Sequence, residues 1–252
     1  MNYNWHWTVL LEAEPGGTGS YLHYLVVGLG WTLATALAAW MIALVIGALV
    51  GTLRTTPMKW VVRAGNLYVE VFRNVPLIVQ MFLWFFVVPE LLPRGLGDWI
   101  KQVPPPWGSY VPAVLCLGIF TSVRVAEQVR AGINSLPRGQ RMAGVAMGLT
   151  ETQAYRYVIL PQSFRIILPP LTSEFMNVIK NSSVALTIGL LELTGRARAM
   201  QEFSFRVFEA FTAATVIYLL TNLIVVVLMR ALEKKVRVPG LIAAAGAPQA
   251  GH

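Results

Sequence analysis

The sequence predicts an all-α integral membrane protein. Apolar residues make up 56% of the 252-residue chain and charged residues only 13%, and the mean hydropathy is +0.59. Between Glu14 and Arg54 there is no Asp, Glu, Lys or Arg. Because about 20 apolar residues span a bilayer core as a helix, this stretch alone is long enough to cross a membrane.

About five transmembrane helices account most economically for the apolar segments. The first covers residues 21–53 and contains Gly28, Gly30, Gly47 and Gly51, so we expect it to tilt and to contact other helices closely. The remaining segments are residues 66–88, 111–131, 163–191 and 209–229.

The basic residues predict how the chain is oriented. The formal net charge is +8, but the cations lie in loops rather than in a stripe with interleaved aromatics, which argues against nucleic-acid binding. Arg54, Lys59 and Arg63 occupy the first loop without an acid, and the third loop and the tail are also basic. Since cytoplasmic loops are enriched in Lys and Arg, we expect a periplasmic N-terminal segment (1–20) and a cytoplasmic tail (239–252).

A proline interrupts the second apolar segment. Pro76 removes a backbone hydrogen bond and disfavours helix at the preceding residue, so carbonyls near Phe72 lose their partners. Inside a membrane such open backbone is tolerated only beside protein or a water-filled path. We therefore expect Arg73 and Asn74 to face that path, and Glu70 can pair with Arg73.

Charged residues stand inside the third apolar segment. Arg124 and Glu127 are three residues apart, so they can pair on one helix face. An ionisable group within a membrane segment is by default a functional hypothesis. Two interpretations stay open: the two charges neutralise each other inside the bundle, or they belong to a substrate path.

The fourth apolar segment also contains polar side chains. Glu174, Asn177 and Asn181 recur at helical spacing and share one face, and Lys180 and Ser182 accompany them. This face is unsuited to lipid. It lines a substrate path or forms a polar seam between helices.

Between the third and fourth segments lies a polar stretch with its own helix signals. Gly139 opens a helix of small residues, and Gly148 ends it, because glycine readily takes the left-handed conformation of a helix C-terminus. Thr150 and Gln153 have the spacing of a capping box for the next helix, which Pro161 bends or breaks.

This stretch resembles the EAA loop of permease subunits of bacterial ABC importers. The matching positions are Met142-Ala143-Gly144, then Gly148, then Ile159-Leu160-Pro161. Met142 replaces the usual acidic residue and Gly144 the second alanine. The resemblance implies a cytoplasmic coupling helix within residues 137–161 that contacts an ATPase through Gly139, Met142, Ala143, Gly144, Ala146, Gly148 and Leu149.

Further segments resemble permeases for polar amino acids, and the glutamate/aspartate permeases are the most similar. The segments are YVEVFRNVPLIVQ, FTSVRVAEQVRAGINSLPRGQ, LTSEFMNVIKNSSV and EKKVRVPG. Relatives that handle other polar amino acids usually have Tyr where Arg124 stands, so the extra cation suits an acidic substrate. We predict that the substrate path includes Arg73, Asn74, Pro76, Arg124, Glu127, Glu174, Asn177, Lys180, Asn181 and Ser182.

The resemblance also implies the partners. Residues 21–238 would form the transmembrane domain of an inner-membrane importer, together with a second permease, two copies of an ATP-binding subunit and a periplasmic amino acid binding protein. ATP and magnesium would bind the ATPase, because this chain has no P-loop. Its histidines are scattered without ligand spacing, so we expect no metal site and no enzymatic activity.

Two alternatives remain open. The permease handles another polar amino acid, such as glutamine, or the chain is a stand-alone carrier driven by an ion gradient. In the second case Glu127 and Glu174 would be ion-coupling sites.

Overall fold

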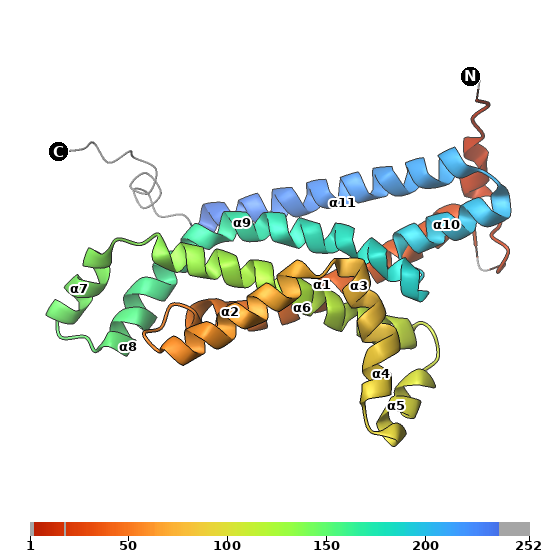
Figure 1. The fold of residues 1–252 in the computed structure, drawn as a ribbon. Coiled ribbons are helices and arrows are strands. Elements are labelled where there is room, and N and C mark those ends of the chain that lie inside the picture. The colour runs from red at the N-terminus through yellow and green to blue at the C-terminus, as the bar shows by residue number, and fades with distance from the viewer. Residues whose placement is uncertain (1–2, 18, 237–252) are drawn as a thin grey trace.

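The computed structural model describes residues 3–17 and 19–236 (Figure 1). All the named elements within these residues are helical, which confirms the predicted all-α class. The α-helices are α1 (Tyr21–Leu53), α2 (Lys59–Asn74), α3 (Leu77–Phe82), α4 (Val88–Leu91), α5 (Arg94–Lys101), α6 (Trp107–Asn134), α7 (Arg138–Ala146), α8 (Glu151–Ala154), α9 (Leu160–Asn181), α10 (Leu193–Ser204) and α11 (Val207–Val236). The 3-10 helices are η1 (Trp7–Leu11) and η4 (Ser182–Ile188), and the π-helices are η2 (Leu83–Val87) and η3 (Tyr155–Ile159).

Three of the five expected spans are single long apolar helices, namely α1, α6 and α11. The expected second span is a pair of helical segments, Lys59–Asn74 and Leu77–Leu91, with a bend of 100° between them. The expected fourth span begins with α9, which has 22 residues. It is less apolar than the other spans because it contains charged residues and the internal prolines Pro169 and Pro170.

Helices α1 and α6 pack closely along much of their length, and glycines allow the approach. A Cβ at Gly47 would lie 2.5 Å from the Cβ of Val125, and one at Gly51 would lie 2.7 Å from the carbonyl oxygen of Ala126. The predicted close contacts are thus present at Gly47 and Gly51, whereas a Cβ at Gly30 would meet no neighbouring heavy atom within 4 Å. Cys116 on α6 is fully buried in the main apolar cluster of the chain.

Helix α10 was missed by the sequence analysis, and a buried carboxylate begins it. Gly189, with a φ of +86°, ends η4. Glu192 is fully buried and caps α10, accepting hydrogen bonds from the backbone N–H of Gly195 at 2.8 Å and of Thr194 at 3.0 Å. It also accepts from the hydroxyl of Tyr218 at 2.9 Å. Glu192 therefore connects the start of α10 to α11.

Different helices form the two ends of the molecule (Figure 1). Helices α7 and α8 form one end, while η1 and α10 lie at the other, and α11 runs along the length between them. Helices α4 and α5 project sideways as an arm. The expected tail, residues 239–252, lies outside the described residues.

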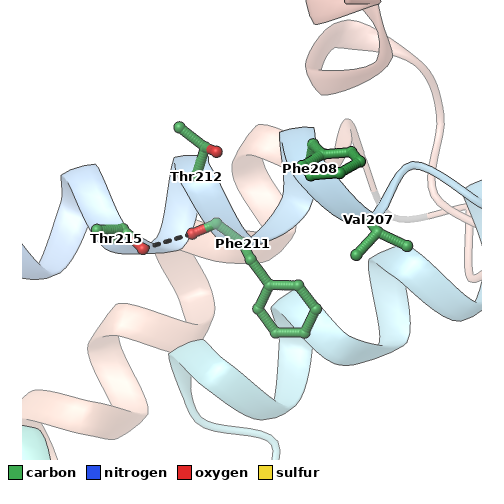
Figure 2. Close-up of a pocket in the computed structure, with 5 residues that line it drawn as sticks. All are labelled: Val207, Phe208, Phe211, Thr212 and Thr215. Atoms are coloured by element: carbon green, nitrogen blue, oxygen red, sulfur yellow. Dashed lines mark hydrogen bonds between the residues drawn. The ribbon is translucent and has the colours of Figure 1, made fainter. Parts of the chain in front are cut away.

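Helix α11 is the least covered of the three single-helix spans. Only 6% of its apolar window is buried within the chain. Near its start it has a shallow hollow of about 250 Å³, where the hydroxyl of Thr215 donates to the carbonyl oxygen of Phe211 in the same helix (Figure 2). The hollow is lined by Val207, Phe208, Phe211, Thr212 and Thr215. This apolar outer face is suited to lipid or to another subunit.

Candidate functional site

Arg124 of α6 and Glu174 of α9 form a charged pair between two packed helices. One guanidinium nitrogen of Arg124 lies 3.9 Å from Oε2 of Glu174. That separation is longer than a hydrogen bond, and Oε2 has no hydrogen-bond partner. The Arg124 side chain is 50% exposed, whereas that of Glu174 is 11% exposed. Arg124 is therefore attracted to Glu174 but keeps its donors available for another acceptor.

The predicted pair of Arg124 with Glu127 is wrong. Glu127 instead accepts a hydrogen bond of 2.9 Å from Arg54, the C-cap residue of α1. Arg54 also donates to the side-chain oxygen of Asn66 on α2 at 2.8 Å. Spacing by three residues permits a pair on one helix, but α1 and α2 bring other partners closer. Glu127 thus belongs to a separate cluster.

At the break in the second span, a side chain satisfies the carbonyls that Pro76 leaves free. The amide nitrogen of Gln80 donates to the carbonyl oxygens of Phe72 at 2.8 Å and Val75 at 2.9 Å. Gln80 is buried, at 3% exposure. Pro76 predicts the freed carbonyls from the sequence, but Gln80 was not predicted as their partner. A polar, hydrogen-bonding side chain four residues after the proline was the available signal.

The residues beside this break lie on the surface of the chain. Arg73, Asn74 and Pro76 are exposed. The side-chain amide of Asn74 donates to the carbonyl oxygen of Glu70 at 2.8 Å. Within the part of the chain that the structure describes, no ion pair joins Glu70 to Arg73, so the suggested pairing is absent.

We expect Gln80→Leu to destabilise the protein. Leucine has a similar size but cannot donate, so two carbonyls would lose their partners in apolar surroundings, at roughly 1–3 kcal/mol for each buried unsatisfied group. Thermal unfolding in detergent measures the effect as a lower Tm. The exposed Gln102 is the matched control, since Gln102→Leu should leave the Tm unchanged. Equal Tm values for both variants would contradict the role of Gln80.

The other polar residues at the end of α9 differ in exposure. Asn177 and Asn181 are half-buried and Lys180 is exposed. Ser182 is fully buried, and its hydroxyl donates to the carbonyl oxygen of Ile179 at 2.8 Å. Ser182, the first residue of η4, thus donates its hydroxyl proton to the last turn of α9. The structure brings Glu174 to Arg124 but leaves Ser182 away from the exposed polar surface.

Helices α7 and α8 form a short hairpin at one end of the molecule (Figure 1). The sequence predicts both helices, with the first ending at Gly148 and the second beginning at Thr150. Gly148 follows α7 with a φ of +89°, and its N–H donates to the carbonyl oxygen of Val145 at 2.9 Å. The capping box of Thr150 and Gln153 begins α8. Both local predictions are confirmed.

An ion pair holds the two helices of this hairpin together. Arg141 donates from Nε and from a terminal nitrogen to the two carboxylate oxygens of Glu151, at 2.7 and 2.9 Å. These hydrogen bonds lower the pKa of the Glu151 carboxyl. Glu151 was not among the residues predicted from the sequence. A hollow of about 590 Å³ lies beside the pair, lined by Arg141, Met142, Val145, Ala146 and Glu151.

Helix α7 has one exposed face and one face that packs on α8. Met142 is 65% exposed, and Gly139, Ala143 and Ala146 are also exposed. Gly144 is buried, and a Cβ there would lie 3.4 Å from that of Ala154 on α8. Leu149 is half-buried and its N–H donates to the carbonyl oxygen of Gly144 at 3.2 Å. One face of α7 thus packs on α8 while Met142 and the alanines are open to a partner.

Residues 43–238 match the family described as binding-protein-dependent transport system inner membrane component. The chain belongs to this family. The permease is 48% identical to the glutamate/aspartate import permease protein GltJ of Escherichia coli (strain K12), over 95% of this chain and 98% of that protein. It is 32% identical to the glutamine transport system permease protein GlnP of the same strain, over 92% of this chain and 98% of that protein.

Solved structures agree with this assignment. The permease resembles a chain in the crystal structure of an amino acid ABC transporter with histidines, with a TM-score of 0.73 and 31% identity, covering 85% of this chain and 95% of that one. A chain of the MetNI methionine ABC transporter in an inward-facing conformation has the same fold, with a TM-score of 0.70 and 21% identity. The permease is therefore a multi-pass transport component of the inner membrane rather than an enzyme.

Proposed function

We propose that this permease moves glutamate and aspartate across the inner membrane as part of an ATP-driven importer. The observation that carries the substrate assignment is the half-exposed guanidinium of Arg124, only loosely paired with Glu174. Because a guanidinium presents a planar fork of donors, it can bind a carboxylate through two hydrogen bonds. The 48% sequence identity to a glutamate/aspartate permease, over 95% of this chain, supports the same class of substrate.

The depth of Arg124 supports its place on a water-filled path. It lies ten residues before Asn134, the last residue of α6, or about 15 Å along the helix axis at 1.5 Å per residue. A half-exposed cation at this depth is poorly tolerated by lipid, so it faces the protein interior or water. The exposed or half-buried polar residues of α2 and α9, both of which contact α6, extend the path: Arg73, Asn74, Asn177, Lys180 and Asn181.

The complex we propose contains a second permease, two ATP-binding subunits that hold ATP and magnesium, and a periplasmic binding protein. The exposed residues of α7 contact the ATPase at the cytoplasmic end. Lys234 and Lys235 near the end of α11 support a cytoplasmic C-terminus. The opposite end, where η1 and α10 lie (Figure 1), would then be periplasmic. Closure of the ATPases would move α7 and switch the path between inward-facing and outward-facing states.

Reconstitution tests this function directly. In liposomes that contain the full complex, we expect uptake of labelled glutamate to require ATP, the ATPase and the binding protein, and excess aspartate to compete more strongly than glutamine. The same chain without the ATPase should take up nothing along a proton or sodium gradient. Gradient-driven uptake by the chain alone would support the carrier alternative, and stronger competition by glutamine would support a glutamine permease.

A further inference from the structure

A side-chain contact joins the coupling segment, residues 137–161, to the turn between α1 and α2. Tyr155 is the first residue of η3, immediately after α8, and its hydroxyl makes a short hydrogen bond with the hydroxyl of Thr55. Thr55 also donates to the carbonyl oxygen of Thr52 at 2.7 Å. Since a hydroxyl has only one proton, Thr55 accepts from Tyr155. The end of α1 is therefore bonded to the segment that follows the ATPase-docking hairpin.

The neighbouring residue extends this connection to α6. Arg54 has only 4% of its side chain exposed and binds Glu127 at 2.9 Å. Glu127 lies one helical turn from Arg124. One terminal nitrogen of Arg54, Nη1, is buried without any hydrogen-bond partner. Buried polar groups are nearly always paired, so Nη1 of Arg54 stands out as a donor that this arrangement of the cluster leaves unpaired.

The coupling segment contains a π-turn. In η3 the N–H of Leu160 donates to the carbonyl oxygen of Tyr155, five residues earlier, which is the π-helical pattern. Single π-turns inside α-helices frequently occur at functional sites. Conversion of this turn to α-helix would shift the register by one residue, which rotates Tyr155 by about 100° around the helix axis. Such a rotation would break the contact with Thr55.

We propose that Thr55 and Arg54 are positioning residues that transmit movement of the coupling segment to α6 and its charges. In this relay, ATPase closure displaces α7 and α8, the π-turn changes register, and the loss of the Tyr155–Thr55 bond releases the Arg54–Glu127 pair. The change thus reaches α6 one turn from Arg124. The inference rests on the proposed function, because it requires the ATPase to dock on α7.

The test uses the complete complex in liposomes with glutamate-loaded binding protein. Tyr155→Phe removes only the hydroxyl, and Thr55→Val removes the same bond together with the one to Thr52. Thr56→Val is the matched control, because Thr56 donates to the carbonyl oxygen of Leu53 at 2.8 Å in the same turn. We expect all three variants to retain the ATPase on purification. Stimulation of ATP hydrolysis by the loaded binding protein should fall about fivefold or more in the first two only, within the usual range of allosteric coupling.

Combining Tyr155→Phe with Thr55→Val should reduce stimulation no further than Thr55→Val alone, because both changes remove the bond between Tyr155 and Thr55. The relay is overturned if the two single variants behave like Thr56→Val, or if their effects add. Loss of the ATPase from Tyr155→Phe would also overturn it, since Tyr155 would then belong to the docking surface. Failure of the docking assignment itself is detected separately, by co-purification of the ATPase with a Gly148 variant.

Discussion

Replacing Arg124 with lysine is expected to reduce glutamate and aspartate uptake roughly tenfold or more while the complex still assembles. Lysine keeps the charge but not the planar fork, so one of two hydrogen bonds to the substrate carboxylate is lost. A hydrogen bond to a charged group contributes about 1.5–3 kcal/mol, and each 1.4 kcal/mol is about a factor of ten in affinity. Uptake of labelled glutamate into liposomes at several substrate concentrations measures the change.

Arg130→Lys on the same helix is the matched control, because Arg130 is half-buried and closer to the end of α6. We expect it to transport normally. Arg124→Tyr should instead lower discrimination against neutral amino acids such as glutamine, provided that the binding protein delivers them. For both variants, uptake is normalised to the amount of assembled complex in the liposomes.

A double substitution separates a substrate role from charge neutralisation. The structure identifies Glu174 as the partner of Arg124, so the informative variant is Arg124→Met with Glu174→Gln. Replacing both members of an ion pair with neutral residues leaves no unpaired charge behind, so it often costs little stability. If Arg124 only neutralises Glu174, the double variant transports glutamate normally. That outcome would remove Arg124 from the substrate path, whereas loss of acidic uptake with intact assembly supports the proposal.

Gly148→Asp is expected to detach the ATPase and abolish transport while the permease remains folded in the membrane. Gly148 has a φ of +89°, and a residue with a Cβ in the left-handed region costs roughly 1–2 kcal/mol. The new carboxylate would also stand beside the exposed, small-residue surface of α7. Co-purification of the ATPase with the permease measures the loss.

Two other variants separate the effect of backbone strain at Gly148 from the effect of the added charge. Gly148→Ala adds the backbone strain without the charge, so it should retain more ATPase than Gly148→Asp. Gly95→Asp places the same carboxylate on α5, where a Cβ has no heavy atom within 4 Å, and should leave the ATPase bound. A Gly148→Asp complex with wild-type ATPase content and full transport would show that the docking segment is wrongly assigned.

The ends and interruptions of helices were predictable because their signals are local. Gly148 and the Thr150–Gln153 capping box act over a few residues, and the structure places both as expected. Pro76 likewise predicts a break in the helix, whatever that helix packs against. Helix α10 was not predictable in this way. Its N-cap, Glu192, is satisfied in part by Tyr218 of α11, a contact that no local pattern predicts. The short length of α10 also gives no apolar segment to detect.

The sequence by itself determined that this is a helical membrane protein, and that one short helix ends at Gly148 and the next begins at Thr150. These properties follow from composition and from contacts between residues close in the chain. Only the tertiary structure decided the partners of the buried charges. Spacing allowed Arg124 to pair with Glu127, but helix packing placed Glu174 beside Arg124 and Arg54 beside Glu127. Charges attract any opposite charge within reach, so the arrangement of the helices selects the pair.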